Sequence, residues 1–242
     1  MKVTYIGHSG FAVELPGAVL LFDYYRGALP QWREDKPLFV FVSHGHRDHF
    51  NWEILKRYGQ CPNVRFFFGN DIRLGEKWLA LRGIGAGVRE KICRLAGGRS
   101  VRETLGDAQV AVRTLKSTDT GVAFVAEVEG KRIYHAGDLN WWHWESEEDA
   151  ENEAMGKAYR EQIDQLAGMH FDVSFVPLDP RLKDSFDLGL NYFLEKTDSP
   201  VVFPMHMWGQ YEAVKEYKAR PQNAPFAGRV LEIETEGQTW NI

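Results

Sequence analysis

The sequence contains few cysteines, with only Cys61 and Cys93 among 242 residues. Two cysteines this far apart cannot form the framework of several disulfides that holds small secreted domains together. A buried free cysteine behaves as a small hydrophobic residue, and scarce cysteine suits a reducing compartment. We therefore expect a cytoplasmic protein.

Long hydrophobic runs and clusters of basic residues are also missing. No apolar stretch approaches the roughly 20 residues that cross a bilayer, and the strand pattern that begins at Lys2 leaves no room for a signal peptide. Lys and Arg number 29 against 34 Asp and Glu, which gives a net charge of −5. We therefore expect no association with membranes and no binding of long nucleic acids, whose phosphates attract basic surfaces.

Apolar residues are plentiful, at 44% of the chain with 13% aromatic, which is enough for a sizeable core. Short β-prone runs alternate with stretches of helical periodicity, and no linker interrupts them. Strands are expected at residues 2–6, 10–15, 18–22, 38–42, 64–68, 110–112, 122–126, 131–135, 171–177, 201–203, 229–234 and 238–241. Helices are expected at 51–57, 71–81, 88–95, 153–167, 186–194 and 211–217. This alternation predicts a single α/β domain over residues 1–242, built as a four-layer αβ/βα sandwich.

A histidine-rich loop follows the wholly apolar run at 38–42, whose pattern is that of a strand buried on both faces. The loop contains His44, His46, Asp48 and His49. Neutral imidazole and carboxylate are ligands for Zn²⁺ and Mn²⁺, and open α/β sheets place their sites at the carboxyl ends of strands. We expect two metal ions about 3.5–4 Å apart. The alternative is a solvated polar loop, because short motifs produce false matches.

This loop resembles the His-x-His-x-Asp-His signature of the metallo-β-lactamase superfamily, which residues 44–49 match at every fixed position. The segments 7–11, 21–23 and 134–138 resemble the ascorbate-6-phosphate-lactonase-like branch of that superfamily. The resemblance covers residues 2 to 240. It implies a sandwich of the metallo-β-lactamase type and a metal-dependent hydrolase, whereas the motif says little about the substrate.

The resemblance also implies roles for residues outside the loop. It assigns Asp138 to a bridge between the two metals, and it assigns His206 to the second metal together with Asp48 and His49. His8 becomes a contact of the substrate or of the metal ligands. The competing interpretations are a turn aspartate for Asp138 and packed histidines for the other two.

One ligand of the family is missing. Members normally supply a third histidine to the first metal from a loop between two mid-chain strands, but the corresponding segment 115–119 has none. Asp119 is the replacement that we expect, which leaves this site either His-His-carboxylate or underfilled. An oxygen ligand weakens the preference for zinc and admits manganese or iron. We expect two divalent ions, Zn or Mn.

Aromatic and basic side chains follow two of the strand ends. Trp141, Trp142 and His143 are expected to form a wall over the metals, because ligand pockets are lined by aromatic groups with a few polar ones. A loop that plugs a hydrophobic gap is the alternative. Arg181 is expected to bind an anionic group of the substrate, with an ion pair inside an exposed loop as the competing explanation.

Together these features predict an enzyme that acts on a small molecule. Bound cations lower the pKa of water from about 15.7 to about 7, so a hydroxide is available near neutral pH to attack a carbonyl or phosphoryl centre. Asp48 is expected to orient this nucleophile, and Asp48 and Asp138 are the expected catalytic residues. The substrate is expected to be an ester, lactone or phosphoester. The alternatives are a small-nucleotide phosphodiesterase or nuclease, and a metal-binding protein with little catalytic activity.

Overall fold

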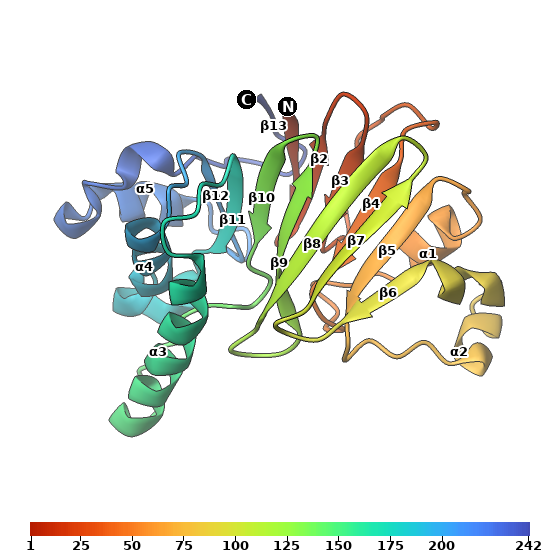
Figure 1. Ribbon diagram of the computed structural model, residues 1–242. Helices are drawn as coiled ribbons and strands as arrows, with labels where there is room; N and C mark the ends of the chain where they lie inside the picture. Colours follow the sequence, from red (N-terminus) through yellow and green to blue (C-terminus); the bar gives the residue numbers. More distant parts are fainter.

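The computed structural model describes residues 1–242, which form thirteen β-strands and five α-helices (Figure 1). The strands are β1 (Lys2–Gly7), β2 (Gly10–Glu14), β3 (Val19–Phe22), β4 (Leu38–Val42), β5 (Val64–Gly69), β6 (Ile92–Leu95), β7 (Ser100–Leu105), β8 (Ala108–Lys116), β9 (Val122–Val128), β10 (Lys131–His135), β11 (Val173–Pro177), β12 (Val202–Met205) and β13 (Thr239–Asn241). The helices are α1 (Glu53–Tyr58), α2 (Glu76–Ala80), α3 (Asp149–Ile163), α4 (Leu188–Lys196) and α5 (Glu212–Ala219). Short 3-10 helices connect several of them.

Two sheets face each other between the helices (Figure 1). The first has the strand order β13-β1-β2-β3-β4-β5-β6 and the second has the order β12-β11-β10-β9-β8-β7. Helices α1 and α2 pack on the outer side of the first sheet, and α3, α4 and α5 pack on the second. The four layers expected from the sequence are therefore confirmed.

Aromatic side chains from both sheets fill the space between them. Phe11 of the first sheet stacks on Phe175 of the second with ring centroids 4.2 Å apart, and Phe22 stacks on Phe41 at 4.7 Å. Such pairs contribute roughly 0.5–1.5 kcal/mol each beyond their burial. They belong to a cluster of 49 buried residues that both sheets share. This core fixes the two sheets relative to each other, and with them the strand ends that carry the site.

The helix expected at 88–95 is wrong. Residues 86–91 form a 3-10 helix, and Ile92–Leu95 continue as β6, which pairs in parallel with Phe66–Gly69. A short apolar run has no periodicity that separates strand from helix, so the sheet edge offered by β5 decides its conformation.

Three further segments also differ from the expectation. Strand β7 was not expected from the sequence, but it pairs along its whole length with β8. The helix expected at 71–81 is limited to α2. Residues 229–234 form no strand and contribute only a bridge from Val230 to Val202.

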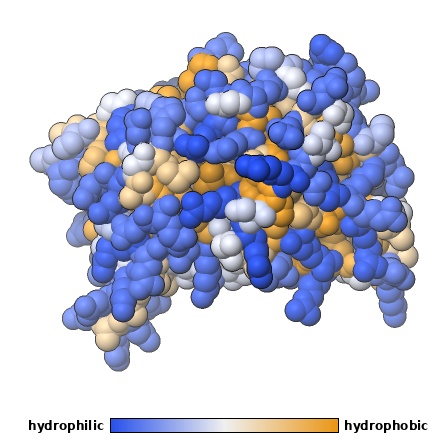
Figure 2. Space-filling model, in the orientation of Figure 1, coloured by the Kyte–Doolittle hydropathy of each residue, from blue (hydrophilic) through white to orange (hydrophobic).

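Polar side chains cover most of the face seen in Figure 1, with hydrophobic atoms showing between them (Figure 2). A hollow of about 380 Å³ over β7, β8 and β9 is bordered by Arg102, Arg113 and Glu127. None of the five α-helices combines the length and the apolar character needed to cross a membrane.

Candidate metal centre

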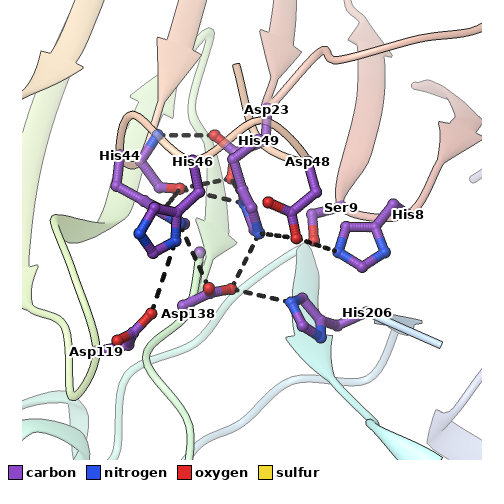
Figure 3. Close-up of polar contacts among 12 residues, drawn as sticks. His8, Ser9, Asp23, His44, His46, Asp48, His49, Asp119, Asp138 and His206 are labelled. Atoms are coloured by element: carbon purple, nitrogen blue, oxygen red, sulfur yellow. Dashed lines mark hydrogen bonds and ion pairs between the residues drawn. The ribbon is translucent and has the colours of Figure 1, made fainter. Parts of the chain in front are cut away.

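Ligand-type side chains from five separate segments meet where strands of the two sheets end (Figure 3). They form two groups, and within each group the potential ligand atoms all lie within 4.8 Å of one another. The first group is His44, His46, Asp119 and Asp138, and the second is His8, Asp48, His49 and His206. Each residue that the sequence predicts as a metal ligand lies in one of them. His8, which was expected as a substrate contact, joins the second group.

Asp138 lies between the two groups. Its Oδ2 is 3.4 Å from His44 Nε2, while its Oδ1 is 3.1 Å from His49 Nε2 and 3.4 Å from His206 Nε2. Before it, Gly137 has a φ of +51°, and a Cβ at this residue would lie 2.6 Å from the Cβ of the residue that precedes His44. Only glycine accommodates this turn, which brings the aspartate backbone against the metal loop.

The two groups differ in their exposure. In the first, the side chains of His46 and Asp119 are 53% and 48% exposed, and His46 Nδ1 lies 3.9 Å from Asp119 Oδ2. In the second, all three imidazoles are buried, and Asp48 is 27% exposed. The first group is therefore open to solvent, whereas the second is almost enclosed.

A buried carboxylate at the end of β3 orients two of the imidazoles. Asp23 accepts hydrogen bonds from His49 Nδ1 (2.7 Å), from the Ser43 backbone N–H (2.7 Å) and from Ser43 Oγ (2.6 Å). Because the Ser43 hydroxyl donates to Asp23, its oxygen accepts from His44 Nδ1 at 2.9 Å. Both imidazoles therefore carry their proton on Nδ1 and turn Nε2 toward Asp138, which is the tautomer that a metal ligand needs.

A second buried carboxylate does the same for His206. Asp179 accepts from His206 Nδ1 at 2.8 Å and pairs with the Arg181 guanidinium through Nε and Nη2. Burial raises the pKa of Asp179, but the hydrogen bonds from His206 and Arg181 outweigh it and lower the pKa to about 2. The ion pair considered from the sequence for Arg181 is thus present, and it supports a ligand histidine.

The protonation of the centre follows from burial and from its carboxylates. Burial lowers the pKa of His8 and of His44, which keeps both imidazoles neutral. Burial also acts to lower the pKa of His49, but the charges of Asp138 and Asp23 outweigh it and raise that pKa well above its ordinary value. A cation bound here would replace this proton, because ligand imidazoles are neutral.

The residues present fit a pair of divalent ions. Four buried polar atoms that face the centre make no hydrogen bond: Nε2 of His8, His44 and His49, and Oδ1 of Asp138. An unsatisfied buried polar atom costs about 1–3 kcal/mol, so four together indicate a missing partner. The donors are imidazole nitrogens and carboxylate oxygens, which suit Zn²⁺ and Mn²⁺.

Backbone strain also gathers at this centre. His8, Asp23 and His206 have φ values of 54°, 40° and 65°. Residues other than glycine in this region cost on the order of 1–3 kcal/mol each, and they concentrate at functional sites. His8 and His206 belong to the second group, and Asp23 holds its His49 in place.

A pocket of about 430 Å³ opens over the two groups, within the range typical of small-molecule sites. Three indoles form part of its wall: Trp142, Trp144 and Trp208. Trp142 also donates through Nε1 to the backbone carbonyl of Asp138 at 3.0 Å, and it stacks on Trp144. Arg181 is the one lysine or arginine in the lining.

The structure divides the predicted substrate contacts. Trp142 and Arg181 line the pocket, but Trp141 and His143 do not. The Trp141 ring packs against α3, where a Cβ on Gly156 would lie 2.6 Å from it. The expectation that Trp141 and His143 form part of the wall is therefore wrong, because neighbouring side chains of this loop point in different directions.

The sequence did not predict the roles of three residues of the site. Asp23 and Asp179 received no role from the sequence, although each follows a buried strand closely, which is the signal that could have identified them. Trp208, with 46% of its surface exposed, follows His206 by two residues and carries no distinguishing pattern.

Comparison with known proteins gives consistent matches. Residues 2–157 match the family model described as the beta-lactamase superfamily domain. A UPF0173 metal-dependent hydrolase of Ignicoccus hospitalis is 28% identical over 253 residues, which cover 96% of this chain and 95% of that relative. Among solved structures, the metallo hydrolase Igni18 of Ignicoccus hospitalis aligns with a TM-score of 0.53 at 20% identity over 100% of this chain and 98% of its own. The metallo-β-lactamase fold protein YhfI of Bacillus subtilis aligns with a TM-score of 0.59 at 15% identity over 99% and 98%.

Proposed function

The chain belongs to the β-lactamase superfamily, as its metal-loop motif predicts, and on that premise we propose that it hydrolyses a small ester, lactone or phosphoester with the help of two divalent metal ions. One observation carries the proposal: two groups of metal-ligand side chains share Asp138 beneath a pocket of small-molecule size. The name metal-dependent hydrolase carried by the relative in Ignicoccus hospitalis supports the reaction class.

The ligands divide between the two ions, either Zn²⁺ or Mn²⁺. His44, His46 and Asp119 would hold the first ion and the second group would hold the other, with Asp138 placed to serve both. When bound, such a pair supplies an activated water and polarises the carbonyl or phosphoryl oxygen of the substrate. The two groups contain three carboxylates, which do not fully neutralise two divalent cations. The remaining positive charge would favour an anionic transition state.

The side chains around the pocket have separate roles. Asp48 lies partly exposed in the pocket lining and orients the attacking water as a hydrogen-bond acceptor. Burial raises its pKa, but the interactions with the neighbouring imidazoles of His8 and His49 outweigh this effect, lower the pKa and keep Asp48 ionised. The indole wall excludes bulk water from one side of the pocket, which strengthens the electrostatic interactions within it.

A substrate panel tests this function. The purified protein, loaded with Zn²⁺ or Mn²⁺, is assayed on lactones, carboxylic esters, phosphate monoesters and phosphodiesters. We expect turnover of at least one class that a chelator abolishes and added metal restores. Preference for cyclic or linear dinucleotides would favour the phosphodiesterase alternative. No turnover of any class with both sites occupied would support a metal-binding protein and contradict the proposal.

Arg181 is expected to determine affinity for anionic substrates. Its guanidinium lies over the rings of Trp208 (4.6 Å) and Trp144 (5.6 Å), and its Nη1 makes no protein hydrogen bond. A hydrogen bond to a charged group contributes roughly 1.5–3 kcal/mol, so Arg181→Gln should raise KM about 10–100-fold for an anionic substrate and change kcat little.

The matched control for this variant is Arg102→Gln, on the exposed strand β7, which should leave KM unchanged. Arg181→Lys should recover part of the affinity, because it keeps the charge but loses the fork of donors. If Arg181→Gln instead lowers kcat and the metal content with KM unchanged, the arginine acts only through Asp179 and His206.

A further inference from the structure

His8 lies in the turn between β1 and β2, far in the sequence from the other ligand-type residues. We infer that His8 is a fourth protein ligand of the second metal ion, which closes that site and leaves the open coordination position to the first ion. The inference rests on the two-metal part of the proposed function and adds that the two ions have different roles, the second structural and the first catalytic.

The position of the His8 ring supports ligation. Its Nε2 is buried, makes no hydrogen bond, and lies 3.4 Å from Asp48 Oδ2, a separation that two ligands of one ion can have. The ring centroid is 4.2 Å from that of His206 and 5.5 Å from that of His49. Three imidazoles and one carboxylate thus converge on one point from three segments of the chain (Figure 3).

A substrate contact explains His8 less well. The residue is 4% exposed and is not part of the pocket lining. No substrate atom reaches a side chain enclosed in this way unless the surrounding residues move. Its pocket-side neighbour Asp48 lies between it and the open space, as expected if both bind the same ion.

The backbone around His8 is also built to hold the ring in place. His8 has a φ of 54°, and its carbonyl accepts a hydrogen bond of 3.3 Å from the backbone N–H of His206, which has a φ of 65°. Two strained residues from opposite sheets therefore fix each other. Strain of this kind persists where the surrounding structure requires a particular geometry.

The difference in exposure between the two groups assigns these roles to the two ions. Structural metal sites have four protein ligands, whereas catalytic sites keep a position open for water or substrate. Each group has four potential ligands, but three of the four in the second are buried imidazoles, while the first has the exposed His46 and Asp119 beside the pocket. The second ion would also join β1 of one sheet to β12 of the other.

Metal titration of variants tests the inference without any measurement of hydrolysis. Metal-free wild type, His8→Gln, His206→Gln and the exposed control His170→Gln are titrated with Zn²⁺ in competition with a chromophoric chelator. We expect His8→Gln to weaken the tighter site at least tenfold, to leave the weaker site unchanged, and to alter the visible spectrum of the Co²⁺-loaded protein. His206→Gln should do the same, and His170→Gln should match wild type.

X-ray absorption on the wild-type protein keeps the inference testable if the variants fail to fold. With one equivalent of Zn²⁺ bound, the spectrum should show three imidazole ligands; two imidazoles would overturn the inference. Wild-type affinities and an unaltered Co²⁺ spectrum in folded His8→Gln would also overturn it. A protein that binds no divalent ion at all would instead contradict the proposed function.

Discussion

Asp138→Ala is expected to remove most of the activity and to reduce the metal bound at both groups. The carboxylate lies 3.1–3.4 Å from histidine nitrogens of each group, so no other single side chain serves both. Metal ions stabilise the transition state by several kcal/mol, and each 1.36 kcal/mol corresponds to a factor of ten. We therefore expect kcat/KM to fall by about 10³-fold or more, together with a loss of metal measured by elemental analysis.

The same measurements on other variants provide the comparison. His206→Ala and Asp48→Ala each remove a ligand of the second group only, and they should lose metal with little change in the fold. Asp198→Ala removes an exposed carboxylate that pairs with His170, and it should match wild type. Full occupancy and near-normal kcat/KM in Asp138→Ala would show that this aspartate is only a turn residue.

Asp119→Ala is expected to empty the first metal site while the second stays filled. The first group has two imidazoles and a half-exposed carboxylate in place of the third histidine of the family, whereas the second has three buried imidazoles and Asp48. Carboxylates do replace imidazoles in three-ligand zinc sites, so Asp119 is a sufficient ligand but leaves this the weaker site. A dilute chelator should therefore strip the first ion before the second.

A second substitution at the same position provides a gain-of-function test. Asp119→His restores the family's ligand type close to the missing position and should tighten the first site. Anomalous diffraction from crystals of both variants measures the occupancy of each site separately. Equal and full occupancy of both sites in Asp119→Ala would show that Asp119 does not bind metal.

The sequence by itself determined the metal centre and the layers. The chemistry of the segment 44–49 is local: four ligand-type side chains follow one buried strand, and no distant contact is needed to recognise them. Asp138 and His206 were assigned through the resemblance to the superfamily, at positions that follow β10 and β12. The order of the layers followed from the alternation of strands and helices, which is also a local property of the chain.

Only the tertiary structure decided which side chains meet. His8 joins the second group because the first sheet lies against the second, a contact between residues about two hundred positions apart that no local pattern records. Asp23 and Asp179 support His49 and His206 for the same reason.

The direction of single side chains also depended on packing. Trp142 faces the pocket and Trp141 faces α3, because the fit of each indole against its surroundings selects its rotamer and the sequence of an irregular loop does not. Likewise β6 is a strand because β5 offers it an edge to pair with. Residue types and their spacing therefore determined the chemistry of this protein, and long-range packing decided its geometry.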